Sequence, residues 1–224
     1  MDAAQTTPQA LITEGFSLQF LLRRPRQVAA RPKAIILLHG VGNNEQDLFG
    51  FANQLPENFL VISPRGPYTP GVGRYAWYEV DFSTGKPVIN QAQEKNSRLL
   101  IANFIEEIKQ AYQVDEIYLG GFSQGAIMSY SVGLTTPGLL RGILSLSGRI
   151  PQEIKLEVAS ASLLAALKIF IAHGVQDTTL SISYAREART YLQDLGLTPS
   201  YHEFEMGHQI SKEEIEAMNQ WLQA

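Results

Sequence analysis

The feature that most constrains the fold of this chain is the pentapeptide Gly-Phe-Ser-Gln-Gly at residues 121–125. Residues 116–120 before it are typical of a buried parallel strand, and residues 126–130 after it are typical of a packed helix. A serine on a tight turn between a strand and a helix exposes its hydroxyl as a nucleophile. Gly121 and Gly125 lack a Cβ, so they permit strained backbone angles and a close approach of strand and helix around Ser123. Taken alone, the pentapeptide is also compatible with an ordinary glycine turn.

Short apolar runs alternate along the chain with longer segments of helical period. This pattern predicts an α/β domain with a mostly parallel central sheet flanked by helices on both faces. The strands are expected at residues 16–22, 34–38, 59–63, 116–120, 142–146, 168–172 and 200–204. The helices are expected at residues 45–55, 91–112, 124–134, 181–195 and 212–222. With 224 residues and 45% hydrophobic content, the chain can bury one substantial core, so a single domain over residues 1–224 is expected.

Several helix ends carry recognisable signals. Asn90 is expected to cap the helix at 91–112, and Ser211 followed by Glu214 forms a capping-box pattern for the last helix. Gly196 is expected to end the helix at 181–195. Residues 154–167 are compatible with a short packed helix or with a mobile flap near the site, and plain packing is the favoured interpretation.

Composition excludes several classes of function. No apolar stretch approaches the roughly 20 residues that span a bilayer, and residues 1–9 are polar, so neither stable membrane insertion nor a secretory signal is expected. The chain has no cysteine, which excludes disulfides and a thiolate nucleophile and is compatible with the cytoplasmic location that we expect. A net charge of −4 without a long basic run argues against nucleic-acid binding. The locally basic residues 23–31 are expected to form a solvated loop between two early strands, with Lys33 beginning the second.

A serine nucleophile needs a general base that titrates near neutral pH, and histidine suits that role best. The chain contains four histidines. His39 and His173 each begin a His-Gly turn after a predicted strand, and His202 lies inside a predicted strand. His208 follows Gly207 in the loop between the last strand and the last helix, where its side chain is free to lean over the carboxyl edge of the sheet. We therefore predict that His208 is the base.

The base in turn needs a carboxylate that holds one tautomer and stabilises its charged form, placed between the nucleophile and the histidine in chain order. Asp177 fits this order, because a short loop separates it from the predicted strand at 168–172. Its carboxylate is then expected at the same sheet edge as Ser123. A local turn with Thr178 and Thr179 is the alternative role for Asp177.

The tetrahedral oxyanion needs two backbone amides, one directly after the nucleophile and one from an earlier strand-to-helix loop. Gln124 supplies the first. The glycine-containing loop at residues 38–44 supplies the second, with the amide of Val41 as our choice and that of Gly42 as the alternative. Phosphate binding by this glycine loop is disfavoured, because neither a Gly-x-Gly-x-x-Gly nor a Gly-Lys-Ser/Thr pattern is present.

These motifs together resemble the phospholipase/carboxylesterase family of α/β hydrolases, which includes bacterial carboxylesterases and acyl-protein thioesterases. The resemblance spans most of the chain and rests on five motifs in order, at residues 38–48, 120–125, 145–148, 172–177 and 206–210. It implies the α/β-hydrolase fold, the triad of Ser123, Asp177 and His208, and oxyanion amides from Val41 and Gln124. It further implies an ester or thioester substrate, no metal and no other cofactor, and it is compatible with a homodimer.

The resemblance also bears on two local features. Trp77, in the sequence Ala-Trp-Tyr, looks like an aromatic that lines the acyl pocket in such enzymes, with simple packing as the alternative. Asp177 is followed by Thr-Thr-Leu where the family commonly shows a valine-proline pair, which puts the loop geometry at Asp177 in doubt.

The expected function is that of a serine carboxylesterase that hydrolyses small carboxylic esters, or thioesters, through an acyl-enzyme intermediate. The alternatives are a lysophospholipase or acyl-protein thioesterase, and a non-catalytic protein that uses the same fold only to hold a ligand. The presence of all three triad candidates disfavours the non-catalytic alternative.

Overall fold

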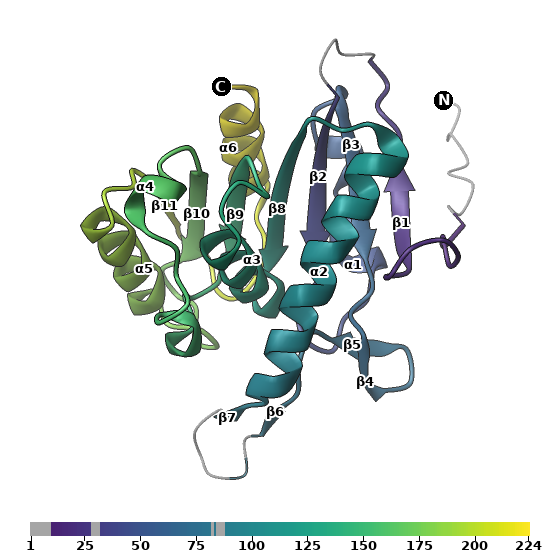
Figure 1. Cartoon of the computed structure of the whole chain (residues 1–224). Coiled ribbons are helices and arrows are strands. Elements are labelled where there is room, and N and C mark those ends of the chain that lie inside the picture. The colour runs from purple at the N-terminus through teal and green to yellow at the C-terminus, as the bar shows by residue number, and fades with distance from the viewer. Residues whose placement is uncertain (1–9, 28–31, 82, 84–87) are drawn as a thin grey trace.

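The central sheet of the protein contains seven strands (Figure 1), seen in a computed structural model that describes residues 10–27, 32–81, 83 and 88–224. The strands are β1 (Phe20–Arg23), β2 (Lys33–Leu38), β3 (Phe59–Pro64), β8 (Glu116–Phe122), β9 (Gly142–Leu146), β10 (Lys168–Gly174) and β11 (Ser200–Phe204). Their order is β1-β3-β2-β8-β9-β10-β11, and only β1 pairs antiparallel with its neighbour. The prediction of a mostly parallel sheet is confirmed. Because one sheet joins β1 to β11, we infer that the chain forms a single domain.

Helices cover both faces of this sheet, as Figure 1 shows. They are α1 (Gln46–Phe49), α2 (Gln91–Tyr112), α3 (Gln124–Thr135), α4 (Ala161–Leu164), α5 (Ser183–Asp194) and α6 (Lys212–Gln223). Successive residues of a strand point to opposite faces. Ile36 of β2 therefore packs in a core cluster with α2, α3 and α5, while its neighbour Ile35 packs in a second cluster with α1 and α6. None of the helices in the described ranges is long and apolar enough to cross a membrane.

Most predicted elements are confirmed, and so are the three predicted helix-end signals, but the strand expected at residues 16–22 begins only at Phe20. The Asn90 side chain accepts a hydrogen bond from the Gln93 amide at the start of α2, and Ser211 accepts one from the Glu214 amide at the start of α6. Gly196 has a positive φ of 78° and follows Leu195, the C-cap of α5, as a helix-ending glycine does. The predicted helix at 45–55 is shorter than expected, because it divides into α1 and a 3₁₀ turn at Ala52–Gln54.

Two small antiparallel strand pairs were not predicted. They are β4 (Tyr68–Gly71) with β5 (Arg74–Ala76), and β6 (Val80–Asp81) with β7 (Val88–Ile89). Each strand has two to four residues, which is too short for a period-2 pattern to be visible. Both pairs lie at the lower end of the molecule in Figure 1, below the carboxyl ends of the parallel strands.

Residues 154–167 pack against the domain, in line with the favoured interpretation. Leu164 of α4 is buried in the core, whereas Leu163 is 62% exposed. Glu157 forms an ion pair of 2.9 Å with Arg98 of α2, and the amide of Ala159 donates to the carbonyl of Leu134 at 2.9 Å. This segment is therefore attached to both α2 and α3.

The prediction of a solvated loop at residues 23–31 is wrong at its first residue. Arg23 belongs to β1 and is only 7% exposed. Its guanidinium group donates to the carbonyls of Pro56 and Phe59, at 2.9 and 3.1 Å, so this cation satisfies buried backbone acceptors. Residues 28–31 of the predicted loop lie outside the described residues.

Glu214, in the first turn of α6, is completely buried. Burial raises the pKa of Glu214 to about 8, although the Ser211 backbone amide acts in the opposite direction. The folded protein therefore keeps this carboxyl group protonated at neutral pH, whereas in the unfolded chain it ionises near pH 4.3. Between these two values the folded state binds more protons, so the free energy of unfolding falls as the pH rises from about 4.5 to about 8.

Glu214→Gln should remove this loss, because glutamine stays neutral and still suits the capping-box position. We expect the variant to exceed the parent protein in unfolding free energy by about 4 to 5 kcal/mol at pH 8. The gain should shrink towards zero at pH 4.5. Urea denaturation of both proteins at the two pH values measures the effect, and an equal difference at both would show that Glu214 is ionised in the folded protein.

Candidate active site

Ser123 lies on the turn between β8 and α3, with φ 54° and ψ −115°. A positive φ is strained for a residue with a side chain. Gly121 and Gly125 do not have positive φ values, so the expectation that they take up strained angles is wrong and the strain lies at Ser123. They serve close approach instead: a Cβ on Gly125 would lie 1.9 Å from the carbonyl oxygen of Leu38, and one on Gly121 would lie 2.4 Å from Gly125 C.

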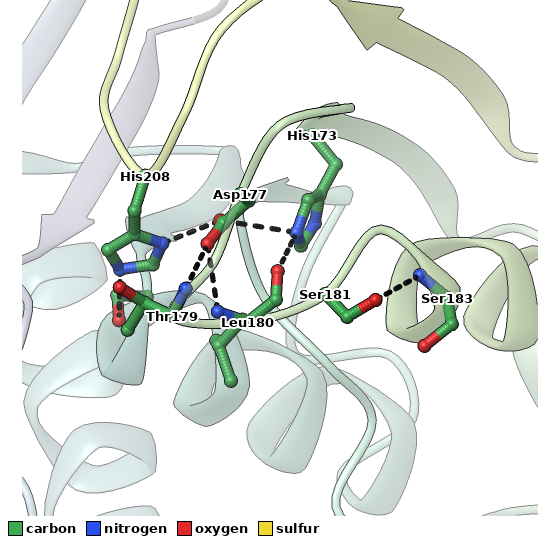
Figure 2. A network of polar contacts seen from close by, with 8 residues as sticks. His173, Asp177, Thr179, Leu180, Ser181, Ser183 and His208 are labelled. Carbon is green, nitrogen blue, oxygen red and sulfur yellow. Dashed lines mark hydrogen bonds and ion pairs between the residues drawn. The ribbon is translucent and has the colours of Figure 1, made fainter.

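His208 comes from the loop between β11 and α6 and reaches Ser123. Its Nε2 atom is 3.0 Å from Ser123 Oγ. Its Nδ1 atom is 2.6 Å from Asp177 Oδ2, as Figure 2 shows. A carboxylate only accepts hydrogen bonds, so Nδ1 carries the proton and Nε2 is left to accept from the serine hydroxyl. The His208 side chain is 18% exposed, and the ring of Phe122 packs beside it at 4.7 Å between centroids. The imidazole is thus oriented and still open to solvent.

Asp177 lies in the loop after β10, and its carboxylate group is fully buried. Oδ1 accepts from the amides of Thr179 and Leu180, at 2.9 and 2.8 Å, while Oδ2 faces His208. On the sequence alone, the local turn and the contact with the histidine base were alternative roles for Asp177. In the structure they coexist, because each uses a different oxygen of the carboxylate. The Thr-Thr-Leu sequence after Asp177 therefore still supplies the amides that orient its carboxylate.

His173 is a second histidine at the same carboxylate, and the sequence had suggested it only as a rejected base. Its Nε2 atom lies 2.7 Å from the carbonyl oxygen of Leu180 and 3.3 Å from Asp177 Oδ2 (Figure 2). Because both of these oxygens are acceptors, Nε2 carries the proton. Burial lowers the pKa of His173, which keeps the ring neutral. The only indication of this contact in the sequence was that His173 lies four residues before Asp177, at the end of the strand that precedes the Asp177 loop.

The two amides predicted for the oxyanion lie in different segments. Gln124 is the first residue of α3, and the first amides of a helix have no acceptor within the helix. The Gly42 amide donates to the carbonyl of Tyr75 at 2.8 Å, so this alternative donor is already engaged. Within the described residues the Val41 amide donates no backbone hydrogen bond, which favours Val41 over Gly42.

Trp77 is completely buried, which favours the packing alternative over the pocket-lining one. Its indole Nε1 donates to the carbonyl of His39 at 2.9 Å, and its backbone amide donates to Gln124 Oε1 at 2.8 Å. Its neighbours Ala76 and Tyr78 instead line an open cleft of about 570 Å³, which Val41 also lines. The cleft is further lined by Pro70, Glu79, Val80, Asp81, Val88, Ile89 and Asn90.

The side chains of the two remaining histidines make structural contacts away from Ser123. His39 is completely buried, its Nε2 accepts from the Gly66 amide at 3.0 Å, and its Nδ1 lies 2.8 Å from the Gly40 carbonyl. His202 lies on β11 against the ring of Phe170. In the part of the chain that the structure describes, no group of three or more His, Cys, Asp or Glu side chains could hold a metal ion.

Comparison with known proteins gives a consistent result. Residues 26–224 match the family model described as Phospholipase/Carboxylesterase. Acyl-protein thioesterase 1 of Neurospora crassa is 26% identical over 90% of this chain and 92% of its own, and the Schizosaccharomyces pombe protein of that name is 29% identical over 87% and 91%. The crystal structure of the Bacillus cereus carboxylesterase matches with a TM-score of 0.79 and 23% identity, over 92% of this chain and 93% of that chain. This structural likeness shows the α/β-hydrolase fold.

Proposed function

The chain belongs to the phospholipase/carboxylesterase family of serine hydrolases, and from that premise we propose that it cleaves carboxylic esters or thioesters through an acyl-enzyme on Ser123. One observation carries the assignment of residues. An unbroken hydrogen-bonded series runs from Ser123 Oγ to His208 Nε2 at 3.0 Å and from His208 Nδ1 to Asp177 Oδ2 at 2.6 Å. This is the arrangement that activates a serine hydroxyl.

In the first half of the proposed reaction, Ser123 Oγ attacks the carbonyl carbon while His208 Nε2 takes the hydroxyl proton. The carbonyl oxygen becomes an oxyanion, which the amides of Val41 and Gln124 stabilise. When the tetrahedral intermediate collapses, the bond to the leaving group breaks and His208 returns its proton to that alcohol or thiol. Asp177 stays ionised and stabilises the imidazolium.

In the second half, water replaces the departed alcohol or thiol. His208 Nε2 takes a proton from this water as its oxygen attacks the acyl carbon, and a second oxyanion forms at the same two amides. Collapse breaks the bond to Ser123 Oγ, which recovers the proton from His208, and the carboxylic acid leaves. The partial exposure of His208 supports this half, because water has access to the base.

The cleft beside Val41 supports an ester with an apolar portion. Its lining includes the apolar residues Ala76, Val80, Val88 and Ile89, and apolar walls favour hydrocarbon groups over charged ones. We propose that this cleft takes one side of the substrate while its carbonyl lies at Ser123. Small carboxylic esters are the first substrate class to test, and thioesters are the second because relatives are named acyl-protein thioesterases.

Labelling with a fluorophosphonate probe tests the proposal directly. We expect the folded protein to be phosphonylated at Ser123, since Oγ attacks phosphorus as it attacks a carbonyl carbon, with His208 taking the hydroxyl proton and fluoride leaving. Peptide mass spectrometry locates the adduct. A heat-denatured sample is the control for non-specific reaction. No adduct on a folded sample would leave the non-catalytic, ligand-holding alternative as the better reading. Hydrolysis rates for an oxygen ester and a thioester of the same acyl group then define the leaving group.

A further inference from the structure

The two proposed oxyanion amides belong to segments that are distant in the sequence. Val41 lies in the loop after β2, whereas Gln124 begins α3. Stabilising an oxyanion requires both donors at about 2.7–3.1 Å from one point, so something must set their separation. A third segment, residues 75–78 at and after the end of β5, forms hydrogen bonds with both sides. We refer to residues 75–78 as the bridging segment.

On one side, the bridging segment contacts the loop both before and after Val41. Before Val41, the carbonyl of His39 accepts from the indole Nε1 of Trp77 at 2.9 Å. After Val41, the Gly42 amide donates to the carbonyl of Tyr75 at 2.8 Å, and the Tyr75 amide donates to the Asn43 carbonyl at 2.8 Å. The peptide that carries the Val41 amide is therefore fixed at both ends by one neighbouring segment.

On the other side, the bridging segment contacts the side chain of the residue that supplies the second amide. Gln124 Oε1 accepts from the Trp77 amide at 2.8 Å, and Gln124 Nε2 donates to the Tyr78 carbonyl at 2.7 Å. Both ends of this side-chain amide are used, and the residue is buried. Buried polar groups with every partner satisfied give a single well-defined arrangement.

The bridging segment and the His39 residue that it contacts are each held by further hydrogen bonds. Ser97 of α2 donates its hydroxyl hydrogen to the carbonyl of Trp77. His39 accepts from the Gly66 amide at Nε2, so its proton is on Nδ1, which donates to the Gly40 carbonyl. Burial lowers the pKa of His39, and the neutral ring keeps this pattern. Trp77 thus ties the loop, the start of α3 and α2 together.

We propose that Trp77, through its indole N–H and its backbone amide, and Gln124, through its side chain, are positioning residues that set the separation of the Val41 and Gln124 amides. This inference rests on the proposed function. Neither side chain touches the reacting atoms, so their removal should weaken transition-state stabilisation and leave ground-state binding unchanged. Loss of one oxyanion donor costs about 10²–10³ in kcat, and a displaced donor should cost less.

Trp77→Phe is the first test, because phenylalanine keeps an aromatic ring in the core but has no N–H for the His39 carbonyl. With an ester whose acylation is rate-limiting, we expect kcat to fall about 10- to 100-fold and KM to stay unchanged. The inhibition constant of a trifluoromethyl ketone should rise by the same factor, since Ser123 converts its carbonyl into an oxyanion. The pH dependence of kcat/KM should not change, because His208 is untouched.

The matched control is Trp221→Phe. Trp221 is the only other tryptophan, lies on α6, and packs edge-on against Tyr118 at 5.8 Å between ring centroids. Its replacement is expected to change thermal stability but neither kcat nor the inhibition constant. Gln124→Met is the second test variant, which retains side-chain length and loses both hydrogen bonds. If circular dichroism shows that Trp77→Phe does not fold, Gln124→Met alone tests the proposal.

The proposal is overturned if folded Trp77→Phe or Gln124→Met retains kcat within twofold of the parent protein. It is equally overturned if the loss is confined to KM, because that result assigns these residues to substrate binding. A parent protein that neither hydrolyses esters nor reacts with a fluorophosphonate would instead refute the proposed function. The two failures are therefore distinguishable.

Discussion

Ser123→Ala is expected to lower kcat for ester hydrolysis by about 10⁶-fold, the loss seen when a member of a cooperating triad is removed. The hydroxyl oxygen lies 3.0 Å from His208 Nε2, and alanine has no oxygen to form the acyl-enzyme. The oxyanion amides and the cleft remain, so a residual rate of about 10³–10⁴-fold over water should persist. Alanine keeps the same Cβ at a φ of 54°, so the backbone strain and the fold should be unaffected.

This expectation is measured as kcat with a chromogenic ester, with thermal unfolding followed in parallel. Ser160→Ala is the matched control, because Ser160 is exposed and its hydroxyl contacts only Ser162 among the described residues. The control should keep the activity of the parent protein. A folded Ser123→Ala variant that retains more than a hundredth of the parent kcat would show that Ser123 is not the nucleophile.

Asp177→Asn is expected to lower kcat by about 10⁴-fold, through the tautomer of His208. All four groups that face the Asp177 carboxylate are donors: the amides of Thr179 and Leu180 and the rings of His208 and His173. The NH₂ group of asparagine must therefore point at one of them. If it points at His208, Nδ1 becomes the acceptor and Nε2 carries the proton, so Nε2 can no longer take one from Ser123.

The opposite orientation of asparagine places its NH₂ group against the amides of Thr179 and Leu180, which leaves buried donors without an acceptor. We therefore expect a lower unfolding temperature together with the lost activity, and kcat is to be measured well below that temperature. Asp194→Asn is the control, since Asp194 is exposed at the end of α5. If a folded Asp177→Asn variant keeps the kcat of the parent protein, Asp177 is not a member of the catalytic triad.

Much of the site could be predicted because it depends on local sequence. The turn at Ser123 needs a strand, two glycines and a helix within about a dozen consecutive residues, and all are visible in the sequence. His208 and Asp177 follow the last parallel strands, and the carboxyl ends of parallel strands meet at one edge of the sheet. The structure brings these residues within hydrogen-bonding distance, while their catalytic roles stay predictions for the experiments above.

The sequence by itself thus determined the succession of the seven central strands and the longer helices along the chain, the helix caps and the residue types of the proposed triad, because each depends on neighbours within one or two elements. The tertiary structure decided what depends on contacts between distant segments. The Tyr75 carbonyl accepts from the Gly42 amide and not from that of Val41, and His173 shares the carboxylate of Asp177. Trp77 is buried and does not line the cleft. The periodicity of apolar residues indicates which face of a helix or strand is buried, but it does not indicate which buried hydrogen-bond donor pairs with which acceptor.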